Sequence, residues 1–498
     1  MMAITRRREG IVALQRSALL AVILLVCSVC GHAANRPDLL LILTDDQSWA
    51  HTGMEAYPSV KTPNFDTLAR QGIYFRQGFV SAPTCTASRS AILSGQDFWR
   101  SGSGAVLHGT YPWELISYQE ILQQHGYRTG FTGKAWGPGY QYDRGTLTGE
   151  QFNTIQKKTV PEGISPTDYA ANLDAFLSSQ PAGQPFSFWV GIQEPHRRRT
   201  AFSTDGYAAN DGNYFATAEQ KRAFPDVLPD TLFARQDFQG YLQQIEQLDG
   251  EVGHIIDVLR QHGRLDNTLI VFTSDNGMPF PGGKSNNSYY GVKVPFAVRW
   301  GQGIRQPHID SSTLVSTIDI APTFLQAAGV PVPPAMTGVS FLPLLVGKPA
   351  PTARQGYVVT GYERHTPEAR PEHGTYPSRA IVTGQYMYIR NFLPDRWPFG
   401  DPPDFADGQS YLLWKDVTDP AEVEWRKTWL LGKRPAEMLF DIQADPFQKT
   451  NLIATTAGMQ KFRNTVEPLR LALQAYLART GDPVLKNPRY FEAMPITR

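Results

Sequence analysis

The hydrophobic positions along the chain predict buried strands that alternate with amphipathic helices. Three nearly continuous apolar runs are found, at residues 38–43, 186–192 and 268–273. Runs of this kind are typical of strands buried on both faces of a parallel sheet. Between and before them, apolar residues recur at helical spacing in residues 62–69, 117–124 and 238–260. The alternation predicts an α/β fold in which a large, mostly parallel sheet lies between helical layers.

The pattern changes after residue 318. A helix is predicted for residues 319–328, with Asp319 as its N-cap and Gly329 after its end. A proline-rich passage over residues 331–351 then leads to a smaller unit. In that unit, residues 378–391 and 437–441 resemble antiparallel strands, and residues 459–478 a terminal helix that Pro468 kinks.

These features divide the chain into three parts. We expect a signal peptide over residues 1–34, a main domain over 35–375 and a smaller α+β subdomain over 376–498, built on an antiparallel sheet. The length of 498 residues is sufficient for two or three domains of ordinary size.

The N-terminal segment has the composition of a secretory signal. Arg6, Arg7 and Arg8 precede an apolar run from Ala18 to Val29, and Ala33-Ala34 offer a cleavage site. The apolar run is short for a membrane span. We therefore expect export to the periplasm or the exterior without a stable membrane anchor, and a retained anchor is the alternative.

The charge balance excludes one class of partner. The formal net charge is +1, but the first 34 residues hold four arginines and a single glutamate, which leaves 43 basic and 45 acidic residues in the remainder. A chain with this balance has no overall basic field, so we expect no nucleic-acid binding.

Oxygen-bearing side chains follow two of the predicted strands. Asp45 and Asp46 come soon after the first apolar run, and Asp275 and Asn276 after the third. Open α/β sheets place their ligands at the carboxyl ends of strands. If the two strands are neighbours, these oxygens can surround one hard divalent cation, Ca²⁺ or Mg²⁺. Ordinary solvated turns are the alternative interpretation.

One cysteine lies outside the N-terminal segment. In a helix that starts at Cys85, the side chains of Ser88 and Arg89 point to the same side as the thiol, because positions i, i+3 and i+4 share a face. A helix N-terminus and an arginine together suit an anion. A buried, inert cysteine is the alternative, but a lone thiol in an exported protein favours a functional one.

The run Cys85-Thr86-Ala87-Ser88-Arg89, followed by Leu93-Ser94-Gly95, resembles the signature of type I sulfatases, which have the alkaline-phosphatase-like fold. The resemblance implies that a formylglycine-generating maturation enzyme oxidises Cys85 to formylglycine. It also implies one divalent cation, Ca²⁺ rather than Mg²⁺. The ligands it implies are Asp45, Asp46, Cys85, Asp275 and Asn276.

The same resemblance gives roles to other residues. It implies that Arg89, Lys134 and Lys284 stabilise the sulfate charge and that His196 transfers a proton. The family has histidine where this chain has Trp136. The arginines at 197–199 could add a cationic patch for an anionic substrate, or could be a solvated face.

The substrate implied is a sulfated sugar. Three segments resemble the branch of the family that cleaves N-sulfoglucosamine of heparan-type glycans: residues 274–281 with Lys284, residues 194–197, and Asn391-Phe392 before Pro398-Phe399. Three alternatives stay open. They are an O-sulfatase acting on another sulfated polysaccharide, a phosphomonoester or phosphonate hydrolase of the same superfamily, and a non-catalytic glycan-binding protein.

Overall fold

The computed structural model describes residues 36–141, 147–197, 215–226, 228–352, 356–365, 374–398 and 432–494. The predicted signal peptide lies outside these residues, as do Arg198 and Arg199. None of the helices in the described ranges combines the length and the apolar character that a bilayer crossing requires.

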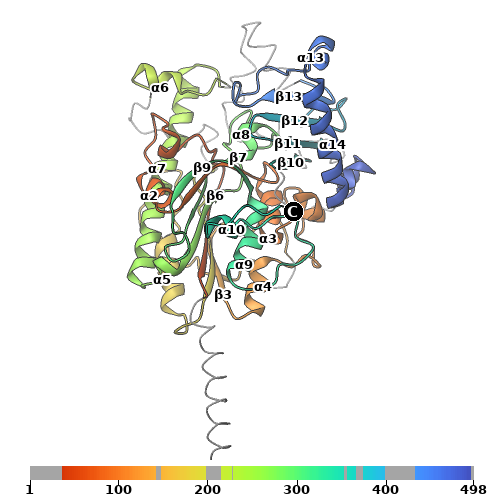
Figure 1. Ribbon diagram of the computed structural model, residues 1–498. Coiled ribbons are helices and arrows are strands. Elements are labelled where there is room, and N and C mark those ends of the chain that lie inside the picture. The colour runs from red at the N-terminus through yellow and green to blue at the C-terminus, as the bar shows by residue number, and fades with distance from the viewer. Residues whose placement is uncertain are drawn as a thin grey trace, which may run out of the picture.

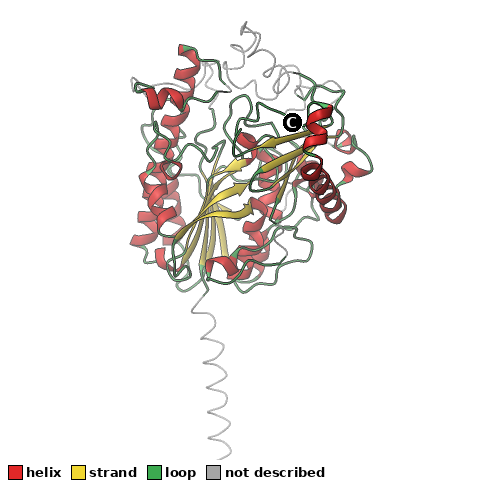
Figure 2. Cartoon of the chain, turned by 45° about the horizontal axis from the view of Figure 1, so that its top comes forward, coloured by secondary structure: helices red, strands yellow, loops and turns green. Residues whose placement is uncertain are grey.

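A large sheet forms the centre of the main domain (Figures 1 and 2). Its strands lie in the order β4 (Glu150–Gln151), β3 (Arg128–Gly133), β5 (Phe186–Gly191), β1 (Asp38–Thr44), β6 (Thr268–Ser274), β8 (Phe296–Arg299), β2 (Ile73–Phe79) and β7 (Lys293–Val294), with β9 (His308–Ser316) also beside β2. The pairs from β4 to β6 are parallel, as the apolar runs predicted. The pairing of β6 with β8 is antiparallel, because the chain turns back to β8 from the carboxyl end of β6.

Helices cover both faces of this sheet, and β1 shows why. Leu40 and Ile42 pack in one hydrophobic cluster and Leu39, Leu41 and Leu43 in another, because successive side chains of a strand point to opposite faces. The first cluster is covered by α2 (Pro63–Arg70), α5 (Tyr169–Ser178) and α7 (Leu232–Gln261). The second is covered by α4 (Tyr118–Gln124) and α9 (Ile320–Ala327). The continuous apolar run of β1 is therefore buried on both sides.

The helix boundaries follow the capping residues. Ser117 closes a capping box with Glu120 at the start of α4. Helix α7 begins six residues before the predicted start, after Thr231, whose hydroxyl accepts a hydrogen bond from the Ala234 amide. Asp319 occupies the predicted N-cap position of α9, but its side chain makes no hydrogen bond to that helix; its carboxylate accepts from the amides of Ser316 and Val339 instead.

A second, four-stranded antiparallel sheet lies beside the large one. It comprises β10 (Val358–Tyr362), β11 (Ser378–Val382), β12 (Tyr386–Asn391) and β13 (Glu437–Asp441). Sequence analysis predicted this sheet but not β10, which precedes the expected boundary at residue 376; that boundary stays a prediction. The terminal helix is divided at Phe462 into α13 (Thr456–Lys461) and α14 (Arg463–Thr480), and Pro468 lies inside α14.

Helix α3 (Cys85–Ser94) is buried along its whole length. Ala87 and Ala91 belong to a hydrophobic cluster with Ile381 and Leu439 of the small sheet and Leu473 of α14. The remaining short helices are α6 (Ala218–Arg222), α8 (Tyr289–Val292) and α10 (Leu342–Leu345). The small sheet, α14 and α3 therefore share one hydrophobic cluster.

Asp97, a buried carboxyl at this junction, makes the stability dependent on pH. It accepts hydrogen bonds from the Tyr476 hydroxyl of α14 at 3.0 and 3.1 Å. Burial raises the pKa of Asp97 to about 7, although these hydrogen bonds lower it. The pKa of Asp97 is higher in the folded chain than in the unfolded chain, so Asp97 contributes stability at pH values below its unfolded pKa. This contribution is lost as the pH rises through 7.

We therefore expect Asp97→Asn to flatten the pH dependence of the unfolding free energy between pH 4 and pH 8, by on the order of 4 kcal/mol. Urea titrations at several pH values measure this. Asp257→Asn, at an exposed carboxylate of α7, is the matched control and leaves the slope unchanged. Equal slopes for Asp97→Asn and the wild-type chain would refute the assignment.

Candidate active site

The carboxyl ends of β1 and β6 bring the predicted oxygen ligands together. The two strands are parallel neighbours, with Thr44 opposite Ser274. The residues that follow each strand, Asp45-Asp46 and Asp275-Asn276, therefore leave the sheet at the same edge. One oxygen from each of the three carboxylates lies within 4.8 Å of the other two. The condition for a shared cation site, that the two strands are neighbours, is therefore met.

The backbone at Asp46 is held in an unusual conformation. Its φ of 74° lies in the left-handed region, which aspartate tolerates better than most residues. The turn is fixed by its side-chain partners. The Asn276 amide donates to one Asp46 oxygen at 2.7 Å and the Lys284 ammonium donates to the other at 2.9 Å. The amide of Asp46 also donates to Asp275 at 3.2 Å, so β1 and β6 are cross-linked beyond their ends.

Helix α3 supplies the cysteine and the arginine. The Cys85 sulfur lies 3.5 Å from an Asp45 oxygen. The Arg89 guanidinium is fully buried and bonds to Asp275 at 2.8 Å, with Asp45 3.8 Å away. It also donates to the carbonyls of Lys134 and Ala135, at 2.8 Å each. The predicted shared face of Cys85 and Arg89 is thus present. The Ser88 hydroxyl is buried without a hydrogen-bond partner.

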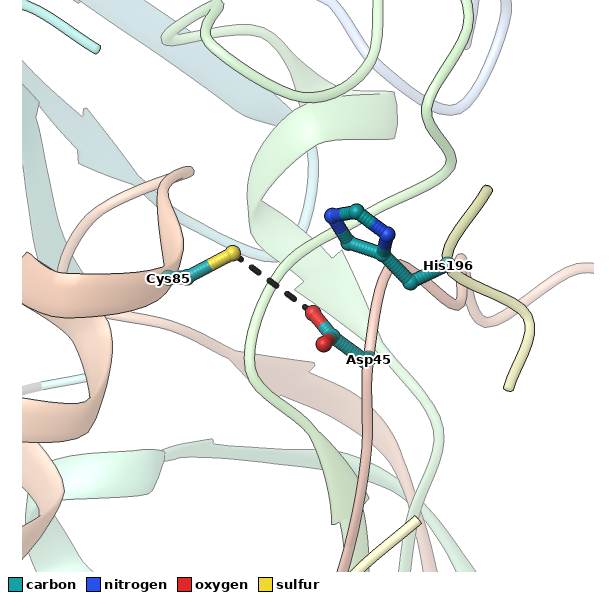
Figure 3. Close-up of side chains that lie close together, drawn as sticks. All are labelled: Asp45, Cys85 and His196. Carbon is teal, nitrogen blue, oxygen red and sulfur yellow. Dashed lines mark hydrogen bonds between the residues drawn. The ribbon is translucent and has the colours of Figure 1, made fainter. Parts of the chain in front are cut away.

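Two further groups reach the same centre from neighbouring loops. Lys134, directly after β3, bonds to Asp45 at 2.5 Å, and His196, after β5, lies 3.9 Å from Asp46. Figure 3 shows His196, Asp45 and Cys85 converging from three segments. The side chains of Lys134 and His196 are 20% and 33% exposed, whereas those of Arg89 and Lys284 are almost fully buried. Lys134 and His196 are therefore the more accessible to a ligand.

The pKa values at this centre are shifted, because several charged groups lie close together in a buried site. Burial and the neighbouring Asp45 raise the pKa of Asp275 to about 6. Burial acts to raise the pKa of Asp45, but Lys134 and His196 lower it well below its usual value. Burial raises the pKa of the Cys85 thiol to about 12. The thiol therefore lacks the depressed pKa that marks reactive cysteines.

The residues present fit a hard divalent cation. The donor set is rich in oxygen, from three carboxylates and one amide, as Ca²⁺ and Mg²⁺ prefer. The carbonyl oxygen of the Asn276 side chain is buried and has no hydrogen-bond partner. A buried acceptor without a donor is costly, and a cation would satisfy it.

Two residues that the sequence singled out have structural partners. The Trp136 indole donates to the Ser90 hydroxyl of α3 at 2.7 Å. Arg197, the described member of the arginine run, is buried and forms a bidentate salt bridge with Asp237 of α7. The guanidinium carbon of Arg197 also lies 4.8 Å from the centre of the Phe280 ring. Arg197 therefore fixes the loop after β5, and the interpretation as a substrate-facing patch is wrong for this residue.

Two contacts near the site, made by His365 and Arg434, were not predicted from the sequence. His365, three residues after β10, lies 2.6 Å from the hydroxyl of Thr84, directly before Cys85. Arg434 donates a hydrogen bond at 2.9 Å to the side chain of Asn286, which is two residues after Lys284 in the chain. No local pattern marks either residue, because each contact joins segments more than 140 positions apart.

An oxygen cluster with cationic side chains at the strand ends of an α/β sheet defines a class of enzymes that act on anionic groups. Comparison with known proteins gives the family. The sulfatase family model matches residues 37–330, more than half of the chain, so the chain belongs to the sulfatase family. It is a hydrolase of sulfate esters or sulfamates. A model described as "N-sulphoglucosamine sulphohydrolase, C-terminal" matches residues 288–404.

Several relatives extend over most of the chain. An ulvan-active sulfatase of Formosa agariphila is 27% identical and covers 91% of this chain and 82% of its own length. The human N-sulphoglucosamine sulphohydrolase is also 27% identical, over 91% of this chain and 93% of its own.

Solved structures share the fold. A 2-O glycosaminoglycan sulfatase has a TM-score of 0.66 at 18% identity and covers 93% of this chain and 97% of its own. A protein solved with its substrate D-glucosamine-2-N,6-O-disulfate has a TM-score of 0.60 at 18% identity, over 92% of this chain and 99% of its own.

Proposed function

We propose that the protein hydrolyses sulfate from a sulfated sugar, with N-sulfoglucosamine of heparan-type glycans as the favoured substrate. The observation that carries the reaction is the convergence of Cys85, Arg89 and Lys134 on a carboxylate cluster at one sheet edge. The substrate rests on the C-terminal match over residues 288–404 and on the human relative, named for N-sulphoglucosamine.

Residue 85 is the proposed nucleophile. A maturation enzyme converts Cys85 to formylglycine, and the hydrate of this aldehyde supplies an oxygen nucleophile that can release the sulfate afterwards. Asp45, Asp46, Asp275 and Asn276 would hold the cation, Ca²⁺ rather than Mg²⁺, together with residue 85. A bound cation lowers the pKa of a hydroxyl and polarises a sulfate oxygen. Family members generally use a metal ion and formylglycine.

The basic side chains are proposed to stabilise charge and to transfer a proton. Arg89 holds Asp275 and the backbone of residues 134–135, so it fixes the geometry as well as adding charge. Lys134 and Lys284 stabilise the sulfuryl oxygens, as charged donors do in a preformed site. His196 is the proposed group for proton transfer, because its side chain is accessible and close to Asp45 and Cys85. The Trp136 indole, whose N–H bonds to Ser90, has no proton of suitable acidity.

An O-sulfatase that acts on another sulfated polysaccharide is the second candidate. The ulvan-active relative favours it. The presence of Trp136, where the family has histidine, also favours a different leaving group. A phosphomonoesterase with a Ser or Thr nucleophile is disfavoured by Cys85.

Export to the periplasm or exterior, through the proposed signal over residues 1–34, would give the enzyme access to extracellular sulfated glycans.

A substrate panel tests this proposal. We expect the Ca²⁺-loaded, matured enzyme to release sulfate from N-sulfoglucosamine at least tenfold faster, in kcat/KM, than from 6-O-sulfated N-acetylglucosamine or a sulfated ulvan disaccharide. Ion chromatography of released sulfate is the measurement. Faster release from the O-sulfated sugars would replace the N-sulfoglucosamine assignment with the second candidate. Release of sulfate from none of these sugars would overturn both.

A further inference from the structure

The hydroxyl of Thr84 does not cap the helix that it precedes. Thr84 is the N-cap residue of α3, and its side chain makes no hydrogen bond to that helix. An N-cap threonine normally accepts from an amide of the first turn. Here its oxygen lies 2.6 Å from the Nδ1 atom of His365. The first-turn amides of α3, which begins with Cys85, are therefore left without this cap.

His365 is held in place by the small sheet. It is 4% exposed and lies three residues after β10. The amide of Gly361 in β10 donates to the Ser81 carbonyl at 2.9 Å, which ties the strand to the loop before Cys85. Glu363 accepts from the Tyr376 amide and from the buried Arg379 guanidinium, both at 2.7 Å. The imidazole thus approaches Thr84 from a rigid support.

We propose that His365 is a positioning residue for sulfate hydrolysis. By engaging the Thr84 hydroxyl, it keeps the first-turn N–H groups of α3 open to the anionic group of the substrate and fixes the backbone that carries residue 85. Amides at a helix N-terminus bind anions when no side chain occupies them. This inference rests on the proposed role of Cys85, because it takes the start of α3 as the place of reaction.

Two matched pairs of variants test the inference. His365→Asn keeps a polar atom near the Nδ1 position, whereas His365→Gln places it near the other ring nitrogen. Thr84→Ser keeps the hydroxyl, whereas Thr84→Val removes it. The readouts are kcat and KM on an aryl sulfate ester and the inhibition constant of inorganic sulfate. All are normalised to the fraction of residue 85 converted to formylglycine, measured by mass spectrometry.

We expect His365→Gln and Thr84→Val to lower kcat/KM on the order of 10- to 100-fold and to weaken inhibition by sulfate, because a misplaced reacting group costs rate on this scale. His365→Asn and Thr84→Ser stay within about threefold of the wild-type enzyme. A purely structural contact would lower the melting temperature without changing the inhibition constant per converted site.

Three outcomes would overturn the inference. One is wild-type kinetics in both His365→Gln and Thr84→Val. Another is equal loss in His365→Asn and His365→Gln with a silent Thr84→Val. The third is a loss of melting temperature alone. If His365→Gln does not fold, the Thr84 pair gives the answer. Full turnover by Cys85→Ala would instead refute the proposed function, so the two failures are distinguishable.

Discussion

Replacing Cys85 with alanine should abolish turnover of every sulfated substrate, with a loss on the order of 10⁴-fold or more, as expected when a covalent nucleophile is removed. The reason is geometric, because residue 85 presents its side-chain atom 3.5 Å from Asp45 at the start of a buried helix. The fold should survive, since the thiol makes a weak hydrogen bond and is small. Release of sulfate, measured under excess substrate, checks the result.

Cys85→Ser is the matched control. It keeps the shape of the side chain and gives residue 85 an oxygen atom, but a serine has no second hydroxyl with which to expel bound sulfate. We expect one molecule of leaving group released per site and no further turnover. Circular dichroism and melting temperature should match the wild-type chain in both variants. Sustained turnover by Cys85→Ala would show that residue 85 is not the nucleophile.

Replacing Asp275 with asparagine should cause the second-largest loss, on the order of 10²- to 10⁴-fold in kcat. Asp275 contacts Arg89 at 2.8 Å and the Asp46 amide at 3.2 Å, and it is a proposed cation ligand. Removal of its charge also leaves the buried Arg89 guanidinium less compensated, so stability falls as well, by about 3–5 kcal/mol at most. Chelator treatment of the wild-type enzyme should reproduce the loss of activity.

Asp266→Asn is the matched control for the cation. Asp266 precedes β6 whereas Asp275 follows it, and its side chain is 77% exposed. This change removes the same charge from the far end of the strand and should leave activity unaltered. Added Ca²⁺ should restore the chelated wild-type enzyme but not Asp275→Asn. Full activity of Asp275→Asn after exhaustive chelation would contradict the proposed cation site.

The parts of the fold that depend on local pattern were predictable from sequence. The apolar run of β1 and that of β6 each end at polar residues, and parallel neighbours necessarily bring those ends to one edge. The spacing of Cys85 and Arg89 likewise fixes a shared helix face. For this reason the carboxylates could be expected at one edge of the sheet, and the cysteine and the arginine on one helix face. That these two groups meet was implied only by the resemblance to sulfatases. Their catalytic roles stay predictions.

Features that depend on contacts between distant segments were not predictable. Strand β10 has only five residues, and its place is set by pairing with β11. His365 reaches Thr84 across 281 positions, and Arg197 finds Asp237 on a helix that covers the sheet. In each case the sequence gives the residue type, but the partner decides whether a charged group is a surface group, a buried support or part of a site.

Mass spectrometry of the peptide that spans residue 85 is the most direct test of the central claim. The enzyme should be produced with a formylglycine-generating enzyme, and the measured sulfatase activity should be compared with the fraction converted. We predict a peptide in which oxygen replaces sulfur and two hydrogens are lost, with activity proportional to its amount. A fully active enzyme whose Cys85 is an unmodified thiol would contradict the account.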